Sequence, residues 1–185
     1  MEYMNTTLSV SNRQNIAPRL HRLVAPKWDA LIARARHLLP ELSRRVVGEV
    51  LEGHSSDPFF QVDRLRLLME TLVRAYAIGI FSSAEIESDA RRSQNYDGEI
   101  SAPPCFAELQ RIRCAHRGLL THCLARVYIL ARKSITPSVI EMFSRQGLLN
   151  EQNEGQTSVD DWHQALTEAN NRVEWACLSD LVVQG

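Results

Sequence analysis

Apolar residues recur every three or four positions in one stretch of the chain, and this spacing constrains the fold more than any other feature. Such a repeat places side chains on one face of an α-helix. No segment alternates apolar and polar residues over the length of a strand. The sequence therefore predicts an all-α protein, a bundle of about six to seven helices. The stripe consists of Val62, Leu65, Met69, Leu72, Val73, Tyr76 and Ile80.

The predicted helices divide the chain into three parts. Residues 1–16 are polar with little periodicity, so we expect a flexible tail there. Residues 17–149 are expected to form the main helical domain, and residues 158–183 a C-terminal amphipathic helix that packs on it. Helices are predicted over residues 27–39, 41–52, 58–80, 82–93, 105–132, 136–147 and 158–182.

A sharp corner is predicted near residues 79–83. Gly79, Ile80 and Phe81 follow the apolar stripe, and Ser82 with Glu85 matches the capping box that begins a helix. Because the break between the two helices is only about two or three residues long, it forces a helix–turn–helix corner.

Charge is unevenly distributed along the chain, although the net charge is only −1. Residues 101–150 carry seven basic and two acidic side chains, whereas residues 151–185 carry one basic and seven acidic ones. Blocks of opposite sign can pair with each other inside a fold, or they can present separate basic and acidic faces. The sequence leaves both arrangements open.

The residues that enzymes use for hydrolysis, phosphate binding or metal binding are not found in a recognisable arrangement. The sequence contains no G-x-x-x-x-G-K-[ST], G-x-G-x-x-G, H-E-x-x-H or G-x-S-x-G motif. The four cysteines include no C-x-x-C pair, which disfavours a zinc site and favours free thiols. We therefore expect a protein that is not an enzyme and that uses no metal and no cofactor.

The sequence also lacks the features of a membrane or secreted protein. No run of about 18 apolar residues is long enough for a transmembrane helix. The first ten residues are polar and do not have the basic-then-apolar layout of a signal peptide. We expect a cytoplasmic protein that does not bind a membrane.

Two groups of titratable residues each have two interpretations. His116 lies on the apolar stripe of the helix predicted over 105–132, where a hydrogen-bonded core histidine is more common than a ligand. Glu85, Glu87 and Asp89 lie close together near a predicted helix start, where the helix dipole favours acids. A metal site there needs ligands from another element, so a solvated acidic helix start is the favoured interpretation.

The helix predicted over 105–132 carries the best candidate for a binding surface. Three arginines and a glutamine lie away from its apolar stripe, two of the arginines at helical spacing from the glutamine. A basic helix after a helix–turn–helix corner is a layout that docks to DNA, with arginines on phosphates or guanine edges. The serines of the corner are candidates for phosphate contact. The candidate DNA-binding residues are Gln110, Arg111, Arg113, Arg117, Ser82 and Ser83.

Two tryptophans, Trp162 and Trp175, lie in the acidic last predicted helix. Both are interpreted first as ordinary core residues. They are also the candidates for binding a partner protein or a second copy of the chain, because tryptophan is common at the centre of interfaces.

The segment from Tyr76 to Glu87, YAIGIFSSAEIE, resembles a motif in the N-terminal domain of many bacterial insertion-sequence DDE transposases. In that family a leucine-rich helix ends in a tyrosine and a glycine. Two serines and an acid then start the next helix, and a long helix rich in phenylalanine and arginine follows. The resemblance covers about residues 60–131 and departs from the family at Ala102–Cys105, where a proline–aspartate pair is usual. The matching residues are Leu67, Leu68, Leu72, Tyr96, Phe106, Arg111, Arg113, His116, Arg117 and Leu120.

The resemblance implies binding rather than catalysis. Transposases continue into a nuclease domain whose three separated acids hold metal ions, and only about 50 residues follow Lys133 here. We therefore expect a non-catalytic helical module that binds DNA or regulates a mobile element. The alternative is a protein–protein interaction or oligomerisation module that does not bind nucleic acid.

Overall fold

The computed structural model describes residues 26–52, 61–92, 102–144 and 159–183. Every regular element in these ranges is a helix, so the all-α prediction is confirmed. The elements are α2 (Pro26–Ala35), a 3-10 helix η2 (Arg36–Leu38), α3 (Leu39–Glu52), α4 (Val62–Ala77), α5 (Ser83–Arg92), α6 (Phe106–Ala115), α7 (Arg117–Ser144) and α8 (Val159–Val183).

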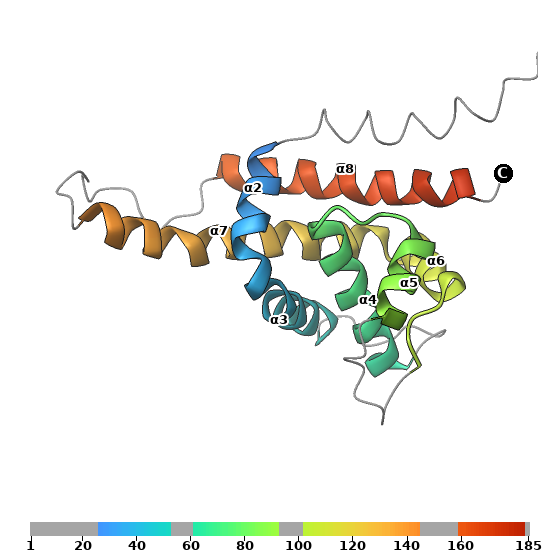
Figure 1. Cartoon of the computed structure of the whole chain (residues 1–185). Coiled ribbons are helices and arrows are strands. Elements are labelled where there is room, and N and C mark those ends of the chain that lie inside the picture. Colours follow the sequence, from blue (N-terminus) through green and yellow to red (C-terminus); the bar gives the residue numbers. More distant parts are fainter. Residues whose placement is uncertain (1–25, 53–60, 93–101, 145–158, 184–185) are drawn as a thin grey trace, which may run out of the picture.

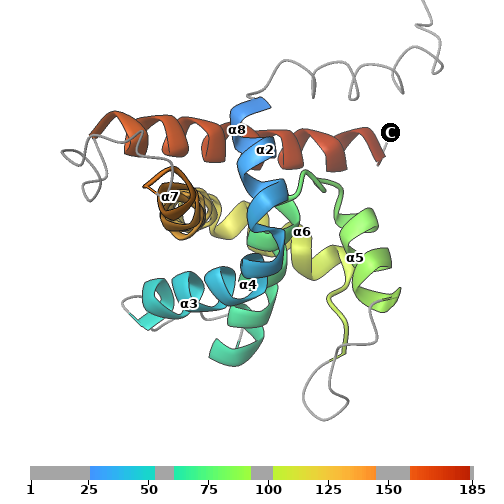
Figure 2. The ribbon, with the colours of Figure 1, turned by 60° about the vertical axis from the view of Figure 1, so that its left-hand side comes forward.

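The two longest helices, α7 and α8, lie side by side and organise the rest of the bundle (Figure 1). α2 packs across α7 and leads through η2 into α3, which packs on both α7 and α4. α4, α5 and α6 pack together at one end of α7, as Figure 2 shows from a second direction. The connection between α4 and α5 therefore comes to lie against α8.

One continuous hydrophobic core contains buried side chains from every α-helix from α2 to α8. The stripe predicted on α4 faces this core, with Leu65, Met69 and Tyr76 buried. Burying an aliphatic side chain of this size contributes about 1.5–3 kcal/mol. Val62 is the exception, because it is 52% exposed at the first position of α4.

The helix predicted over residues 105–132 is two helices, so this prediction is wrong in one respect. α6 ends at Ala115 and α7 begins at Arg117, and His116 between them has non-helical dihedral angles of φ −120° and ψ 30°. His116 is half-buried at this break instead of on a continuous stripe. Gly118 just beyond it is exposed, and an added Cβ would meet no atom within 4 Å. The glycine is therefore not required by close packing.

One predicted helix boundary at a proline is also wrong: a new helix was expected at Thr136–Pro137, but α7 continues through both residues to Ser144. The boundary expected near Pro40 is present, because η2 ends at Leu38 and α3 begins at Leu39. Pro40 lies in the first turn of α3, where a missing N–H costs little. The tail predicted over 1–16 and the predicted helix starts at residues 58 and 158 lie outside the described residues.

The corner predicted near residues 79–83 is present, but the break spans residues 78–82 and is longer than the expected two or three residues, because α4 already ends at Ala77. Gly79 forms its tightest part. Gly79 has φ 85°, in the left-handed region that residues with a Cβ avoid. Two backbone hydrogen bonds close the turn, from Gly79 N–H to the Tyr76 carbonyl (3.2 Å) and from Ile80 N–H to the Ala75 carbonyl (2.9 Å). They satisfy carbonyls that the end of α4 leaves free.

Substitution of Gly79 by alanine is therefore expected to lower the free energy of unfolding by about 1–2 kcal/mol. Gly48→Ala is the matched control, because Gly48 lies inside α3 with no atom within 4 Å of an added Cβ. That change is expected to raise the free energy by about 0.5–1 kcal/mol. Urea unfolding followed by circular dichroism measures both, and equal effects of the two substitutions would contradict the assigned turn.

Candidate functional site

The most unusual feature of the interior is a buried arginine, Arg113 of α6, whose side chain is 1% exposed. Its guanidinium lies where α4, the corner and α8 meet. Arg113 Nη1 forms an ion pair with Asp180 Oδ2 at 2.6 Å, and the Asp180 side chain is only 3% exposed. A buried charge of this kind is stable only when a counter-charge and hydrogen bonds replace the lost water.

All five N–H groups of this guanidinium have acceptors. Nε donates to the Tyr76 hydroxyl at 2.6 Å. Nη1 donates to Asp180 and to the carbonyl of Ala176, and Nη2 donates to the Phe81 carbonyl and to Ser83 Oγ, both at 2.9 Å. Burial raises the pKa of Tyr76, so its hydroxyl stays neutral and acts as an acceptor here.

Ser83 completes this group of residues, which we call the Arg113 cluster: Tyr76, Phe81, Ser83, Arg113, Ala176 and Asp180. The backbone N–H of Ser83 donates to Asp180 Oδ1 at 2.8 Å, and its hydroxyl donates to Oδ2 at 2.7 Å. Asp180 therefore accepts from the first residue of α5 and from Arg113 of α6. The cluster ties the corner and α6 to the C-terminal half of α8.

A second buried arginine, Arg172 of α8, binds the end of α4 from the other side. Its Nη1 donates to the carbonyls of Tyr76 (3.0 Å) and Ala77 (2.9 Å), which are at the C-terminus of α4. Its charge is balanced by Glu168 at 2.6 Å and by Asp29 of α2. A cation at a helix C-terminus interacts favourably with the helix dipole. Two arginines therefore fix the last turn of α4 and the corner after it.

The opposite charges of the two C-terminal blocks pair inside the fold, which is one of the two arrangements that the sequence leaves open. Besides Arg113 and Asp180, Arg117 Nη2 lies 2.8 Å from Glu174 Oε1, and Arg132 pairs with Asp161. These contacts join α6 and α7 to α8. Many of the arginines expected to form an exposed basic face are therefore bound within the protein.

This arrangement corrects the predicted position of two DNA-binding candidates. Arg113 was expected on an exposed face, but it is buried, because it lies one residue after Ile112 and four after Leu109, both core residues. Ser83 is also fully buried, and its hydroxyl is bound to Asp180. Neither side chain lies on the surface, where DNA phosphates would be reached.

The remaining candidates lie nearer the surface, but the structure does not bring them into one group with the corner serines. Arg111 is exposed and makes no hydrogen bond or ion pair with another described residue. Arg117 is 49% exposed and paired with Glu174. Gln110 and Ser82 are half-buried.

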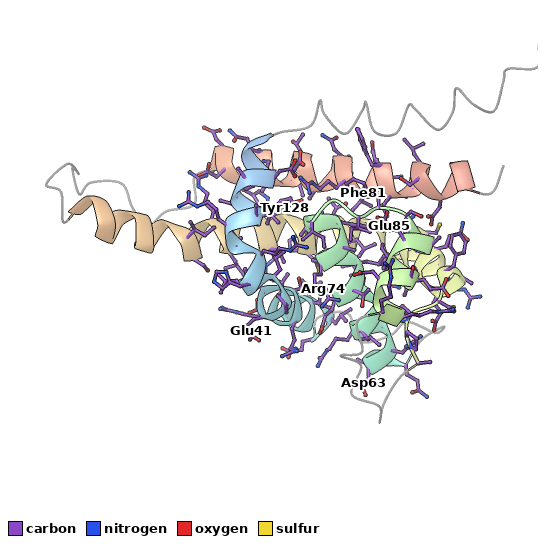
Figure 3. The ribbon with its side chains drawn as sticks, viewed as in Figure 1. Glu41, Asp63, Arg74, Phe81, Glu85 and Tyr128 are labelled. Atoms are coloured by element: carbon purple, nitrogen blue, oxygen red, sulfur yellow. The ribbon has the colours of Figure 1, made fainter. Side chains whose placement is uncertain are left out.

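The helix that follows the corner, α5, presents acids to solvent. Glu85 and Asp89 are exposed there, and Figure 3 shows Glu85 near the start of α5. Glu87 is half-buried and pairs with Arg91, while its second oxygen accepts the backbone N–H of Phe106 at 3.0 Å. Glu87 therefore connects α5 to the start of α6. The last turn of α5 also carries the exposed Arg91 and Arg92, so the surface of this helix has charges of both signs.

The predicted partner-binding tryptophans are both half-buried. Trp162 contacts the ring of His122 with a centroid distance of 5.6 Å. Trp175 packs on Phe81 of the corner at 6.4 Å, and Figure 3 shows Phe81 beside α8. Trp162 packs against the core, as the first interpretation expects, whereas Trp175 contacts Phe81 at the edge of the core. Both tryptophans keep part of their surface outside it.

Two leucines that follow Trp175 along α8 are mostly exposed. Leu178 is 60% exposed and Leu181 is 64% exposed. They follow Trp175 at intervals of three residues, so the three side chains lie on the outer side of α8. We call Trp175, Leu178 and Leu181 the α8 patch. The spacing of the three residues of the patch can be found in the sequence. Their position on the outer side of α8 follows from the burial of Ala176 and Asp180, which only the structure shows.

Among the described residues, no group of three or more His, Cys, Asp and Glu side chains is placed to hold a metal ion. In the same residues, no helix combines the length and the apolar character required to cross a bilayer.

Comparisons with known proteins give no relative. The chain matches no protein-family model, no curated protein and no solved structure. The resemblance to transposase N-terminal domains therefore stays a prediction that rests on the motif alone.

Removal of the Arg113 side chain is expected to destabilise the protein strongly, since it leaves Asp180 buried without its counter-charge. Arg113→Ala is expected to lower the free energy of unfolding by about 3–5 kcal/mol. Arg111→Ala, two positions away and exposed, is expected to change it by less than about 0.5 kcal/mol. Urea denaturation of both variants tests this difference, and similar values would show that Arg113 is not a structural residue.

Proposed function

We propose that this protein is a non-catalytic helical module that associates with a second copy of itself through the α8 patch. The observation that carries the proposal is the exposure of two adjacent leucines beside a tryptophan, at the C-terminal end of a helix. Exposed apolar side chains that gather in one place are typical of interaction sites. Scattered single leucines on a surface need no such explanation.

The α8 patch lies on a rigid support. Behind it, Ala176 and Asp180 are bound to Arg113, and Trp175 packs against Phe81. The backbone of α8 is therefore held in place behind the patch, and association does not require this helix to become ordered. This favours a binding role over an accidental exposure of apolar surface.

The charges beside the patch favour a second copy as the partner. Arg117 and Glu174 lie at its edge, and each is about half exposed, at 49% and 47%. Because these two charges pair with each other, the edge carries no net charge, and two copies can face each other about a two-fold axis without repulsion there. The net charge of −1 also gives little repulsion between copies.

Leu178→Asp combined with Leu181→Asp is expected to abolish self-association. Because the patch is small compared with a stable interface, wild-type protein is expected to dimerise only weakly, with a dimer fraction that rises over the concentration series. Sedimentation equilibrium over a concentration series measures this. Val159→Asp is the matched control, since Val159 is 73% exposed at the opposite end of α8.

Circular dichroism of the double variant must show unchanged helix content for the comparison to count. A wild-type protein that remains monomeric at every concentration would refute self-association. Equal loss of dimer in the Val159→Asp protein would place the interface elsewhere on α8.

DNA binding is the second candidate, and it is supported by Arg111 together with the motif resemblance. Arg111 is exposed on α6 and makes no contact with another described side chain, so its guanidinium is available to a phosphate. In this form of the hypothesis, the module binds DNA or regulates a mobile element through α6.

Arg111→Ala is expected to weaken DNA binding and to reduce the salt dependence by about one counter-ion. Fluorescence anisotropy with a labelled duplex at about 50 and 200 mM salt measures both effects. Arg34→Ala provides the control, because Arg34 is equally exposed and unpaired among the described residues but lies on α2. Wild-type protein that does not bind at low salt would exclude this candidate.

A further inference from the structure

Two cysteines flank the contact between α6 and α8. The two helices pack against each other, and Arg113 of α6 donates to the carbonyl of Ala176 on α8. Cys114 is the residue that follows Arg113, and Cys177 is the residue that follows Ala176. Both cysteines therefore lie beside a direct contact between the two helices.

The neighbours of Cys177 along α8 show which side of the helix it lies on. Glu174, three residues before it, pairs with Arg117 at the start of α7, and Asp180, three residues after it, pairs with Arg113 of α6. Residues three apart are neighbours on a helix surface. Cys177 thus lies between two positions of α8 that contact α6 and the start of α7.

The exposure of the two thiols suits a reaction that starts at one and ends at the other. Cys114 is exposed and Cys177 is half-buried, and both are free thiols. Burial raises the pKa of Cys177, whereas Arg113 and Arg117 lower it, and a charge on Cys114 raises it further. The side chains that act on the Cys177 thiol thus come from α6 and the start of α7, in agreement with the packing of α8 on these helices.

We propose that Cys114 and Cys177 form a disulfide that joins α6 to α8 when the protein meets hydrogen peroxide. The Cys114 sulfur attacks one peroxide oxygen, the O–O bond breaks, and a sulfenic acid and one water form. The Cys177 sulfur then attacks the Cys114 sulfur, and the S–S bond forms as the S–O bond breaks. The leaving hydroxide takes the Cys177 proton as a second water. Two thiols thus lose two electrons and two protons, and the peroxide is reduced to two waters.

The test is oxidation of the reduced, dilute full chain with one equivalent of hydrogen peroxide. Intact mass spectrometry is expected to show a loss of about 2 Da, the mass of two hydrogen atoms, which a thiol reductant reverses. Proteolytic mapping without reduction is expected to find the Cys114 and Cys177 peptides joined. Cys114→Ser and Cys177→Ser each abolish the loss. Cys105→Ser retains it.

Other results would overturn the proposal. These are no mass change, oxygen addition at Cys114 alone, a disulfide that includes Cys105 or Cys123, or a cross-linked dimer on a non-reducing gel. Cys123 is an internal negative control, since it is fully buried and burial raises its pKa to about 12. The disulfide does not depend on self-association, so the Leu178→Asp, Leu181→Asp protein is expected to form it equally.

Discussion

The structure depends above all on one permanently charged side chain that is held away from water. A guanidinium cannot lose its proton in a protein, so Arg113 can be buried only where an anion and enough acceptors surround it. Five segments meet that requirement together: the end of α4, the corner, the start of α5, α6 itself and α8. Each segment is therefore placed by the same group, and displacement of any one leaves a charge or a donor unsatisfied.

The same principle explains the charge pattern of the whole chain. The basic block on α6 and α7 and the acidic block on α8 form inter-helix contacts such as Arg117 with Glu174. Arg172 adds a connection to α2 through Asp29. A basic segment is therefore not by itself a sign of a nucleic-acid surface, because its charges can be used to assemble the fold. In this protein the exposure of the α8 patch is the surface feature that charge pairing between helices does not explain.

The sequence predicted features that depend on neighbouring residues better than features that depend on distant ones. The helices and the corner near Gly79 follow from local spacing and were found. The break at His116 was missed because the apolar spacing continues on both sides of it, and the continuous helix through Pro137 was missed because a proline is a strong local stop signal. These outcomes are decided by packing on α7 and α8, which no short window contains.

The buried position of Arg113 was also missed, although the sequence held a signal for it. Its spacing from Leu109 and Ile112 places it at the edge of the apolar stripe, next to core residues. Its counter-charge, Asp180, lies 67 residues further along the chain. A local pattern cannot join two such residues, and only the opposite signs of the two C-terminal blocks suggested that they meet.

The long separations in this network have a consequence for how the chain acquires its structure. Ser83 and Asp180 are 97 residues apart, and Asp29 and Arg172 are 143 residues apart. During synthesis, α2 to α7 leave the ribosome before α8 is made. The Arg113 side chain therefore stays solvated until Asp180 is available to pair with it. The folding transition is therefore expected to be slow for a helical protein and highly cooperative, with docking of α8 as the event that commits the nascent chain to its native state.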